Sequence, residues 1–271
     1  YGFSRLDGRL YSDYGDFVVL AGRPSAGKTA MALQMAVHMG RHDKVGFYSL
    51  ETSPAKLTNR IIANRAIVDF GRINRREMTQ EEWERVVRLK GEIMESDVEL
   101  IPASGWSVQD ILSTALQRRH KIIFIDYLQQ LTGRGKDRFE QVTRISLDLH
   151  AMAQTHGILV VALSQLNRAS TARPDAAPTL TDLRESGQIE QDADAVLALY
   201  INEEENAPPN ERCLQVLKNK EGRLGKVRLD FDGNLQQFAE YMDGQREVIL
   251  QTARMEKKHE NSSHYANQIN K

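Results

Sequence analysis

The sequence predicts an α/β fold, in which a mostly parallel, twisted sheet carries helices on both faces and antiparallel strands at its C-terminal edge. Continuous apolar runs, typical of strands buried on both faces, alternate with amphipathic helical stretches as far as Leu166. The first of these runs ends in a glycine-rich loop that opens directly into a helical stretch. After Asp192 the pattern changes to short β-like segments joined by turn residues such as Asp232 and Gly233.

The individual elements follow from apolar spacing and from capping residues. Strands are expected at residues 16–22, 44–50, 98–102, 121–128, 157–166, 193–201, 213–220, 225–232 and 234–241, and helices at residues 28–40, 53–67, 79–96, 107–120 and 138–156. Ser53 followed by Pro54, and Ser107 followed by Asp110, are N-terminal signals for two of these helices. A polar stretch, residues 167–178, is expected to be a loop.

Composition indicates an ordinary globular chain. Of its 271 residues, 41% are hydrophobic and 27% are charged, and the net charge is −1, so a polyanion would have to be bound by a local patch. The lone Cys213 excludes an internal disulfide and is read as an inert strand residue, which fits a reducing cytoplasm. No apolar run is long enough to span a membrane. Residues 1–241 are expected to form one domain and residues 242–271 a frayed or disordered tail.

The loop after the first expected strand reads GRPSAGKT and matches the pattern G-x-x-x-x-G-K-[ST] between a strand and a helix. In such a loop, backbone N–H groups point at phosphate oxygens, and Gly27 lets the backbone come close. Lys28 places its charge on the β and γ phosphates, while Thr29 offers a hydroxyl to Mg²⁺. The sequence therefore predicts a site for ATP and Mg²⁺, with nucleotide contacts from Gly22, Pro24, Ser25, Ala26, Gly27, Lys28, Thr29 and Ala30.

Three polar residues at the ends of other expected strands complete this candidate site. Asp126 ends the apolar run IIFID, where a nucleotide-binding sheet needs a carboxylate for Mg²⁺. Glu51 closes the second strand, where it could deprotonate an attacking water or cap the following helix; the residues alone leave both roles open. Gln165 could hydrogen-bond the γ-phosphate and signal hydrolysis to the next loop.

Five separated stretches share a resemblance. GRPSAGKT, SLETS, IIFIDYLQQL, LSQLNR and LRESGQIEQDADAV resemble, in this order, the ATPase motor domain of the DnaB-type replicative DNA helicases of bacteria and phages. The first stretch is generic, whereas the last is far more specific and favours this family over other P-loop ATPases. The resemblance covers roughly residues 2–241 and implies a RecA-like P-loop NTPase that works as a homohexamer. It also implies ATP between subunits, single-stranded DNA in the channel, 5′–3′ translocation, and a primase and a helicase loader as partners.

The resemblance also implies roles for single residues. Glu51 matches the family's catalytic glutamate and Gln165 its γ-phosphate sensor, while Lys28, Thr29 and Asp126 match the phosphate and Mg²⁺ residues. Arg184, Glu185 and Gly187 match the loop that touches the DNA backbone. Contacts to phosphates, which are the same at every nucleotide, suit translocation along DNA of any base sequence. A second basic stretch, residues 133–138, is either a channel-facing segment or a solvated loop.

The chain departs from the family at two places. The family carries a Lys-x-Arg pair on a late strand, which reaches the neighbour's ATP, whereas this chain has Lys218 and Lys220. Because lysine lacks the bidentate fork, either Lys220 does the work less well, or Arg223 replaces it, or the contact with the neighbour's ATP is built differently. We also expect the family's N-terminal helical domain to be absent, which would leave an isolated motor domain whose hexameric ring is weak or does not form.

The leading hypothesis is an ATP-dependent DNA helicase motor. The enzyme alternative is a RecA-like recombinase or related ATPase dependent on single-stranded DNA, which would form filaments. An alternative of another class is a nucleotide-binding switch, a loader or clamp subunit that does not hydrolyse ATP. The set of Lys28, Glu51 and Asp126 argues against the switch, which has no use for a catalytic base.

Overall fold

The computed structural model describes the chain except for residues 95, 167–176, 184–186, 205, 243 and 246–271. Its strands are β1 (Phe17–Gly22), β2 (Val45–Ser49), β3 (Val98–Pro102), β4 (Ile122–Asp126), β5 (Leu159–Gln165), β6 (Ala195–Ile201), β7 (Glu211–Asn219), β8 (Gly225–Asp232) and β9 (Gln237–Glu240). Within the described residues they form one nine-stranded sheet in the order β3-β2-β4-β5-β1-β6-β7-β8-β9. The strands from β3 to β6 are parallel, and β7, β8 and β9 add antiparallel pairs at one edge. The predicted fold class is confirmed.

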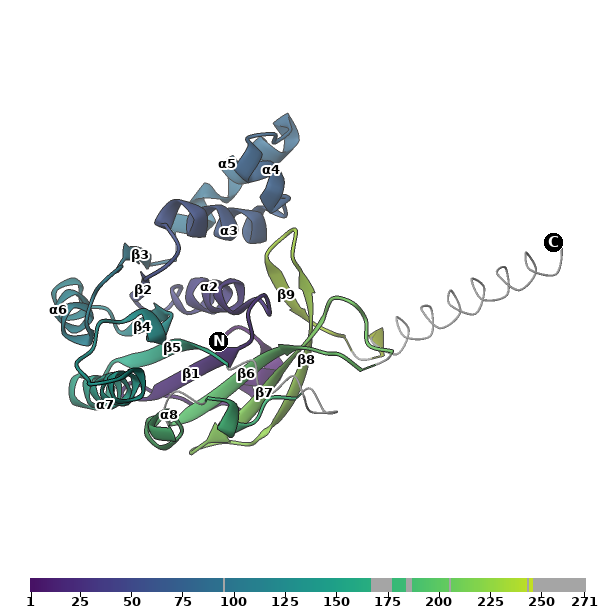
Figure 1. The fold of residues 1–271 in the computed structure, drawn as a ribbon. Helices are drawn as coiled ribbons and strands as arrows, with labels where there is room; N and C mark the ends of the chain where they lie inside the picture. The colour runs from purple at the N-terminus through teal and green to yellow at the C-terminus, as the bar shows by residue number, and fades with distance from the viewer. Residues whose placement is uncertain (95, 167–176, 184–186, 205, 243, 246–271) are drawn as a thin grey trace, which may run out of the picture.

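Helices cover both faces of this sheet (Figure 1). The described helices are α1 (Ser4–Asp7), α2 (Lys28–Met39), α3 (Pro54–Ala66), α4 (Phe70–Arg75), α5 (Gln80–Met94), α6 (Val108–Arg118), α7 (Arg138–His156) and α8 (Gly187–Asp192), with short 3₁₀ turns η1 (Leu128–Gln130) and η3 (Leu180–Asp182). In Figure 1, α2 lies over one face and α3, α4 and α5 extend beyond it, whereas α6, α7 and α8 lie on the opposite side.

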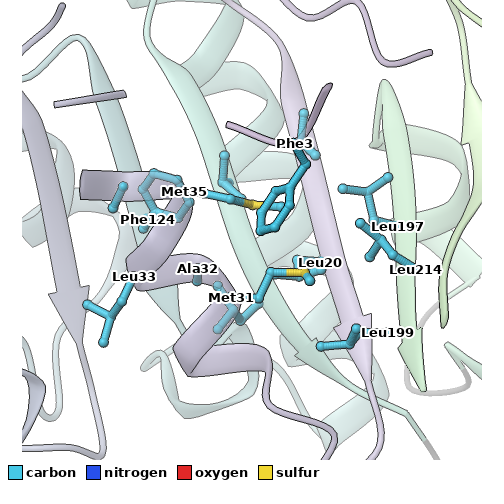
Figure 2. Packing of buried hydrophobic residues seen from close by; sticks show 14 of the residues in the cluster. Phe3, Leu20, Met31, Ala32, Leu33, Met35, Phe124, Leu197, Leu199 and Leu214 are labelled. Atoms are coloured by element: carbon cyan, nitrogen blue, oxygen red, sulfur yellow. The ribbon is translucent and has the colours of Figure 1, made fainter. Parts of the chain in front are cut away.

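Two apolar cores hold these layers together because successive residues of a strand point to opposite faces. In β1, Val18 and Leu20 pack under α2, while Phe17, Val19 and Ala21 pack against the layer of α6 and α7. Figure 2 shows Met31 and Met35 of α2 meeting Leu20 and the strand residues around it. The consequence for function is that α2, and the loop that precedes it, is fixed by full burial of its inner face.

The capping predictions hold to different degrees. Ser107 and Asp110 form a capping box at the start of α6, in which each side chain accepts from the other residue's backbone N–H. Ser53 occupies the N-cap of α3 before Pro54, but its side chain makes no capping hydrogen bond.

Cys213 is buried in β7, as predicted. Most of the predicted tail, residues 242–271, and most of the predicted loop, residues 167–178, lie outside the described part of the chain.

Candidate nucleotide site and its connections

The parallel strands bring four of the predicted residues to one edge of the sheet. Gly22, the last residue of β1, is in register with Gln165, the last residue of β5. Asp126, the last residue of β4, is in register with Ser49 of β2, and Glu51 follows two residues later. Because the carboxyl ends of parallel strands meet at the same edge, this is the edge where open α/β sheets bind ligands.

The loop between β1 and α2 depends on glycine at two positions. Gly27, the N-cap of α2, has φ 98°, and a Cβ there would lie 2.8 Å from a ring carbon of Phe238. Phe238 stacks on Phe231 with ring centroids 4.3 Å apart, so the β8–β9 hairpin packs against the loop at Gly27. A Cβ on Gly22 would lie 2.7 Å from the carbonyl oxygen of Leu199. The loop is therefore held close to the sheet edge with the N-terminus of α2 directly behind it.

Lys28 and Asp126 form the charged centre of the site. The Lys28 ammonium donates to the carbonyl oxygens of Gly22 at 2.9 Å and Arg23 at 3.2 Å. Burial lowers the pKa of Lys28, while the charges of Asp126 and Glu51 act to raise that pKa. An ammonium held by neutral carbonyls and partly withdrawn from water is well placed to gain from a polyanionic ligand.

Thr29 and Asp126 are directly connected. The Thr29 hydroxyl donates to Oδ2 of Asp126 at 2.8 Å. Asp126 is only 6% exposed, and burial raises the pKa of its carboxyl, with Thr29 and Lys28 acting in the opposite direction. A hydroxyl and a carboxylate side by side are oxygen ligands of the kind that Mg²⁺ prefers. No group of three or more His, Cys, Asp or Glu that could hold a metal is found among the described residues.

Glu51 and Gln165 flank this centre with exposed side chains. Gln165 is oriented through its backbone, since its N–H donates to Oε1 of Gln129 at 3.2 Å. The Gln129 amide in turn donates to the hydroxyl of Ser164 at 2.9 Å. A carboxylate and an amide at this edge could position a water and sense a terminal phosphate.

Two residues at this edge were missed by the sequence reasoning. Gln129 is buried and ties η1 to the end of β5, and its carbonyl also accepts from Arg138 at the start of α7. Arg60 of α3 lies over the ring of Phe70 at 5.7 Å, and its buried Nε has no hydrogen-bond partner among the described residues. Burial lowers the pKa of Arg60, and its charge acts on Asp126. A lone glutamine after a predicted strand, or a lone arginine in a helical pattern, carries no signal of such a role.

Lys218 and Lys220 lie away from this edge. The Lys220 ammonium pairs with Oδ1 of Asp194 at 2.5 Å, and Oδ2 of Asp194 accepts from the backbone N–H of Phe17 at 2.8 Å. Phe17 begins β1, so the glycine-rich loop starts five residues further along, about 16 Å at the usual rise of a strand. Lys218 donates to the carbonyl oxygens of Glu190 at 2.6 Å and Gln191 at 3.0 Å. Neither lysine can reach a phosphate held by Lys28 of the same chain.

The predicted DNA-contact residues are only partly described. Arg184 and Glu185 lie outside the described residues, and Gly187 is the exposed first residue of α8. A Cβ on Gly187 would meet no atom within 4 Å, so the local packing does not require glycine there. In the second basic stretch, Arg134 and Lys136 are exposed, while Arg138 is bound to Gln129. The described residues contain no helix that is both long and apolar enough to cross a membrane.

Together, the sheet order, the glycine-rich loop and the paired Thr29 and Asp126 define a P-loop ATPase domain with the RecA-like fold. The family model "DnaB-like helicase C terminal domain" matches residues 1–240. The chain belongs to this family.

Known relatives agree with this assignment. The chain is 36% identical over 232 residues to a "Probable plasmid replicative DNA helicase" of Chlamydia trachomatis, covering 83% of this chain and 51% of the relative. It is 32% identical over 244 residues to the "Replicative DNA helicase DnaB" of Geobacillus stearothermophilus, covering 85% and 54% respectively. The chain thus spans about half the length of these relatives.

Solved structures show the same fold. The "ATPase Domain of G40P" superposes with a TM-score of 0.84 at 36% identity, covering 89% of this chain and 90% of that one. A structure titled "The Structure Of A DnaB-Like Replicative Helicase And Its Interactions With Primase" gives a TM-score of 0.84 at 36% identity, covering 89% and 61%.

Proposed function

We propose that this chain is the motor of a replicative DNA helicase, which hydrolyses ATP between the subunits of a homohexamer and moves 5′–3′ on single-stranded DNA to unwind duplex DNA. The observation that carries the proposal is the meeting of Lys28, Thr29 and Asp126 at one sheet edge, in a chain that the helicase family model matches over residues 1–240. A primase and a helicase loader are the protein partners expected with this function.

The binding step is assigned to the loop and α2. Backbone N–H groups at the start of α2 and the Lys28 ammonium bind the phosphates, and the phosphate oxygens replace the carbonyls of Gly22 and Arg23 as partners of Lys28. Thr29 and Asp126 would hold Mg²⁺, which would supply positive charge against the negative charge of the β and γ phosphates. The residues fit the ion because two oxygen donors already lie 2.8 Å apart.

The cleavage step is assigned to Glu51, Gln165 and a neighbouring subunit. Glu51 orients the attacking water and takes its proton, and Gln165 hydrogen-bonds the terminal phosphate. Lys218 and Lys220 supply positive charge to the ATP of the next subunit, which their distance from their own loop supports. Arg184, Glu185 and Gly187 contact the DNA backbone.

ATP turnover with and without single-stranded DNA, measured on a sample whose mass is determined in parallel, tests this proposal. We expect hexamers, turnover stimulated by DNA, and loss of turnover in Glu51→Gln with nucleotide binding retained. Filaments with strand exchange would favour the recombinase, and absence of turnover in assembled rings with any DNA would favour the nucleotide-binding switch.

A further inference from the structure

Asp194 connects the first residue of β1 to the lysine pair. Its carboxylate accepts from the Phe17 N–H at 2.8 Å and from the Lys220 ammonium at 2.5 Å, and Nδ1 of His150 lies 4.0 Å away. Its backbone is fixed as well, since its N–H donates to the Phe17 carbonyl at 2.7 Å and its carbonyl accepts from the Lys220 N–H at 3.0 Å. The Asp194 side chain is 14% exposed, whereas that of Lys220 is 47% exposed. Asp194 is therefore the fixed partner of this ion pair and Lys220 the partner that can move.

Lys218 makes the neighbouring connection, to α8. Its ammonium caps the carbonyls of Glu190 and Gln191 in the last turn of this short helix. Burial lowers the pKa of Lys218, and the charge of Lys220 lowers it further. Asp192 adds two contacts in this turn, since it accepts from the Ser146 hydroxyl at 2.8 Å and from Gln188 at 2.6 Å. The two lysines thus have intramolecular partners at Asp194 and at the end of α8.

We infer that Asp194 is a positioning residue that holds Lys220 back from the neighbouring subunit, and that Lys218 and Lys220 exchange their intramolecular partners for the neighbour's terminal phosphate. This inference rests on the proposed function, because it takes the lysine pair to act on the next subunit's ATP. Asp194 is fixed, so a shift of Lys220 toward a phosphate bound to another subunit lengthens its 2.5 Å ion pair with this carboxylate. The Asp194 carboxylate and the phosphate therefore compete for the same ammonium, and the phosphate, with its greater charge, is favoured when the interface closes.

The exchange has a consequence for α8. When Lys218 leaves, the carbonyls of Glu190 and Gln191 lose their donor, so the C-terminal turn of α8 is less restrained. Gly187, which the proposed function assigns to the DNA backbone, begins the same helix. Engagement of the neighbour's ATP is therefore linked through Lys218 to the mobility of an element on the DNA side.

The variant Asp194→Asn removes the charge of this residue but keeps its hydrogen bond with the Phe17 N–H. The Asn side-chain oxygen still accepts from the Phe17 N–H, but the ion pair with Lys220 is lost. Ion pairs of this exposure contribute little to stability, so the variant should fold normally. Because Lys220 is no longer held by Asp194, we expect turnover without DNA to rise about twofold to fivefold, and the stimulation by DNA to be smaller. In the Lys220→Ala background, Asp194→Asn should change nothing. Glu77→Gln, which removes an exposed ion pair with Arg75 far from the site, is the matched control.

The outcomes separate the inference from the function on which it rests. Unchanged or lower DNA-free turnover in a folded Asp194→Asn, or a rise that persists in Lys220→Ala, overturns the inference and leaves the helicase proposal intact. Unchanged turnover in Lys220→Ala alone, in assembled rings, removes the trans role of Lys220 and the inference with it.

A measurement that needs no change at Asp194 is amide hydrogen exchange of α8. A non-hydrolysable ATP analogue should raise this exchange in assembled wild-type rings and have no further effect in Lys218→Met; unchanged exchange in the wild type contradicts the inference.

Discussion

The hydroxyl of Thr29 donates a 2.8 Å hydrogen bond to the carboxylate of Asp126, which joins the first turn of α2 to the end of β4 across 97 positions of the sequence. The bond places two oxygen ligands together beside the Lys28 ammonium, and it does so around a carboxylate that is almost fully buried. The site thus carries an electrostatic cost in the protein alone, and the bound metal and nucleotide are expected to offset that cost.

Asp126→Asn should therefore separate stability from activity. Burial raises the pKa of Asp126 in the folded state above its unfolded value, so this group makes folding less favourable as pH rises through the range where the carboxyl ionises. Asn removes that cost at neutral pH and can still accept from Thr29. We expect a melting temperature about 1–4 °C higher without nucleotide, together with loss of Mg²⁺-dependent turnover. Calorimetry at pH 7.5 checks the first effect, and a melting temperature lower than that of the wild type would contradict the assigned cost.

Gly27→Ala should damage both the fold and the nucleotide site. The backbone there has φ 98°, and the added Cβ would lie 2.8 Å from Phe238. We expect a loss of about 1–3 kcal/mol in the free energy of unfolding and a large loss of nucleotide affinity. Gly187→Ala, at a position where a Cβ meets no atom within 4 Å, is the control and should leave stability unchanged. Equal melting temperatures for Gly27→Ala and the wild type would show that the loop relaxes freely.

Gln129→Ala tests whether the end of β5 is held from η1. The substitution leaves the buried Ser164 hydroxyl and the Gln165 N–H without their side-chain partner. We expect a loss of about 1–3 kcal/mol in stability and lower kcat with little change in KM for ATP, because Gln165 loses its orientation. Denaturant unfolding and steady-state kinetics on the same preparation measure both quantities. Normal kcat in a destabilised variant would mean that Gln165 is positioned without Gln129.

Arg184→Ala tests the proposed binding to the DNA backbone, although residue 184 lies outside the described residues. An arginine that neutralises a phosphate releases counterions, so the variant should bind single-stranded DNA more weakly on all sequences. The slope of log affinity against log salt should also be shallower, by about one for each phosphate that the ring no longer neutralises. Fluorescence anisotropy with homopolymeric and mixed oligonucleotides over a salt series gives both quantities. Weaker binding confined to one sequence would point to base recognition instead.

Local patterns were sufficient to predict the sheet and the loop. Buried strands such as β4 and β5 are continuous apolar runs, and the loop from Gly22 to Thr29 has fixed spacing, so each is visible without tertiary information. The short helices α4 and α8 were missed because six residues give too little periodicity, and α4 depends on its Asp69 cap and the cluster around Ile73.

The intramolecular partners of Lys218 and Lys220 could not be predicted from the sequence. Asp194 lies 26 positions before Lys220, and the two meet only because β7 turns back antiparallel along β6. The same holds for Gln129 and Arg60, whose places at the site follow from packing between elements. Sequence spacing indicates which residues share a strand end; it does not show which side chains a neighbouring strand or helix brings beside them.

The central claim is that one ATP is handled by two subunits, and subunit mixing tests it most directly. Glu51→Gln and Lys220→Ala are each expected to be nearly inactive as pure rings. In mixed rings, some interfaces combine an intact Glu51 with an intact Lys220 from the next subunit, about a quarter of them at equal mixing. We predict that ATP turnover stimulated by single-stranded DNA reappears on mixing, at about that fraction of the wild-type rate. Mixed rings verified by native mass spectrometry that stay as inactive as their parents would contradict the claim.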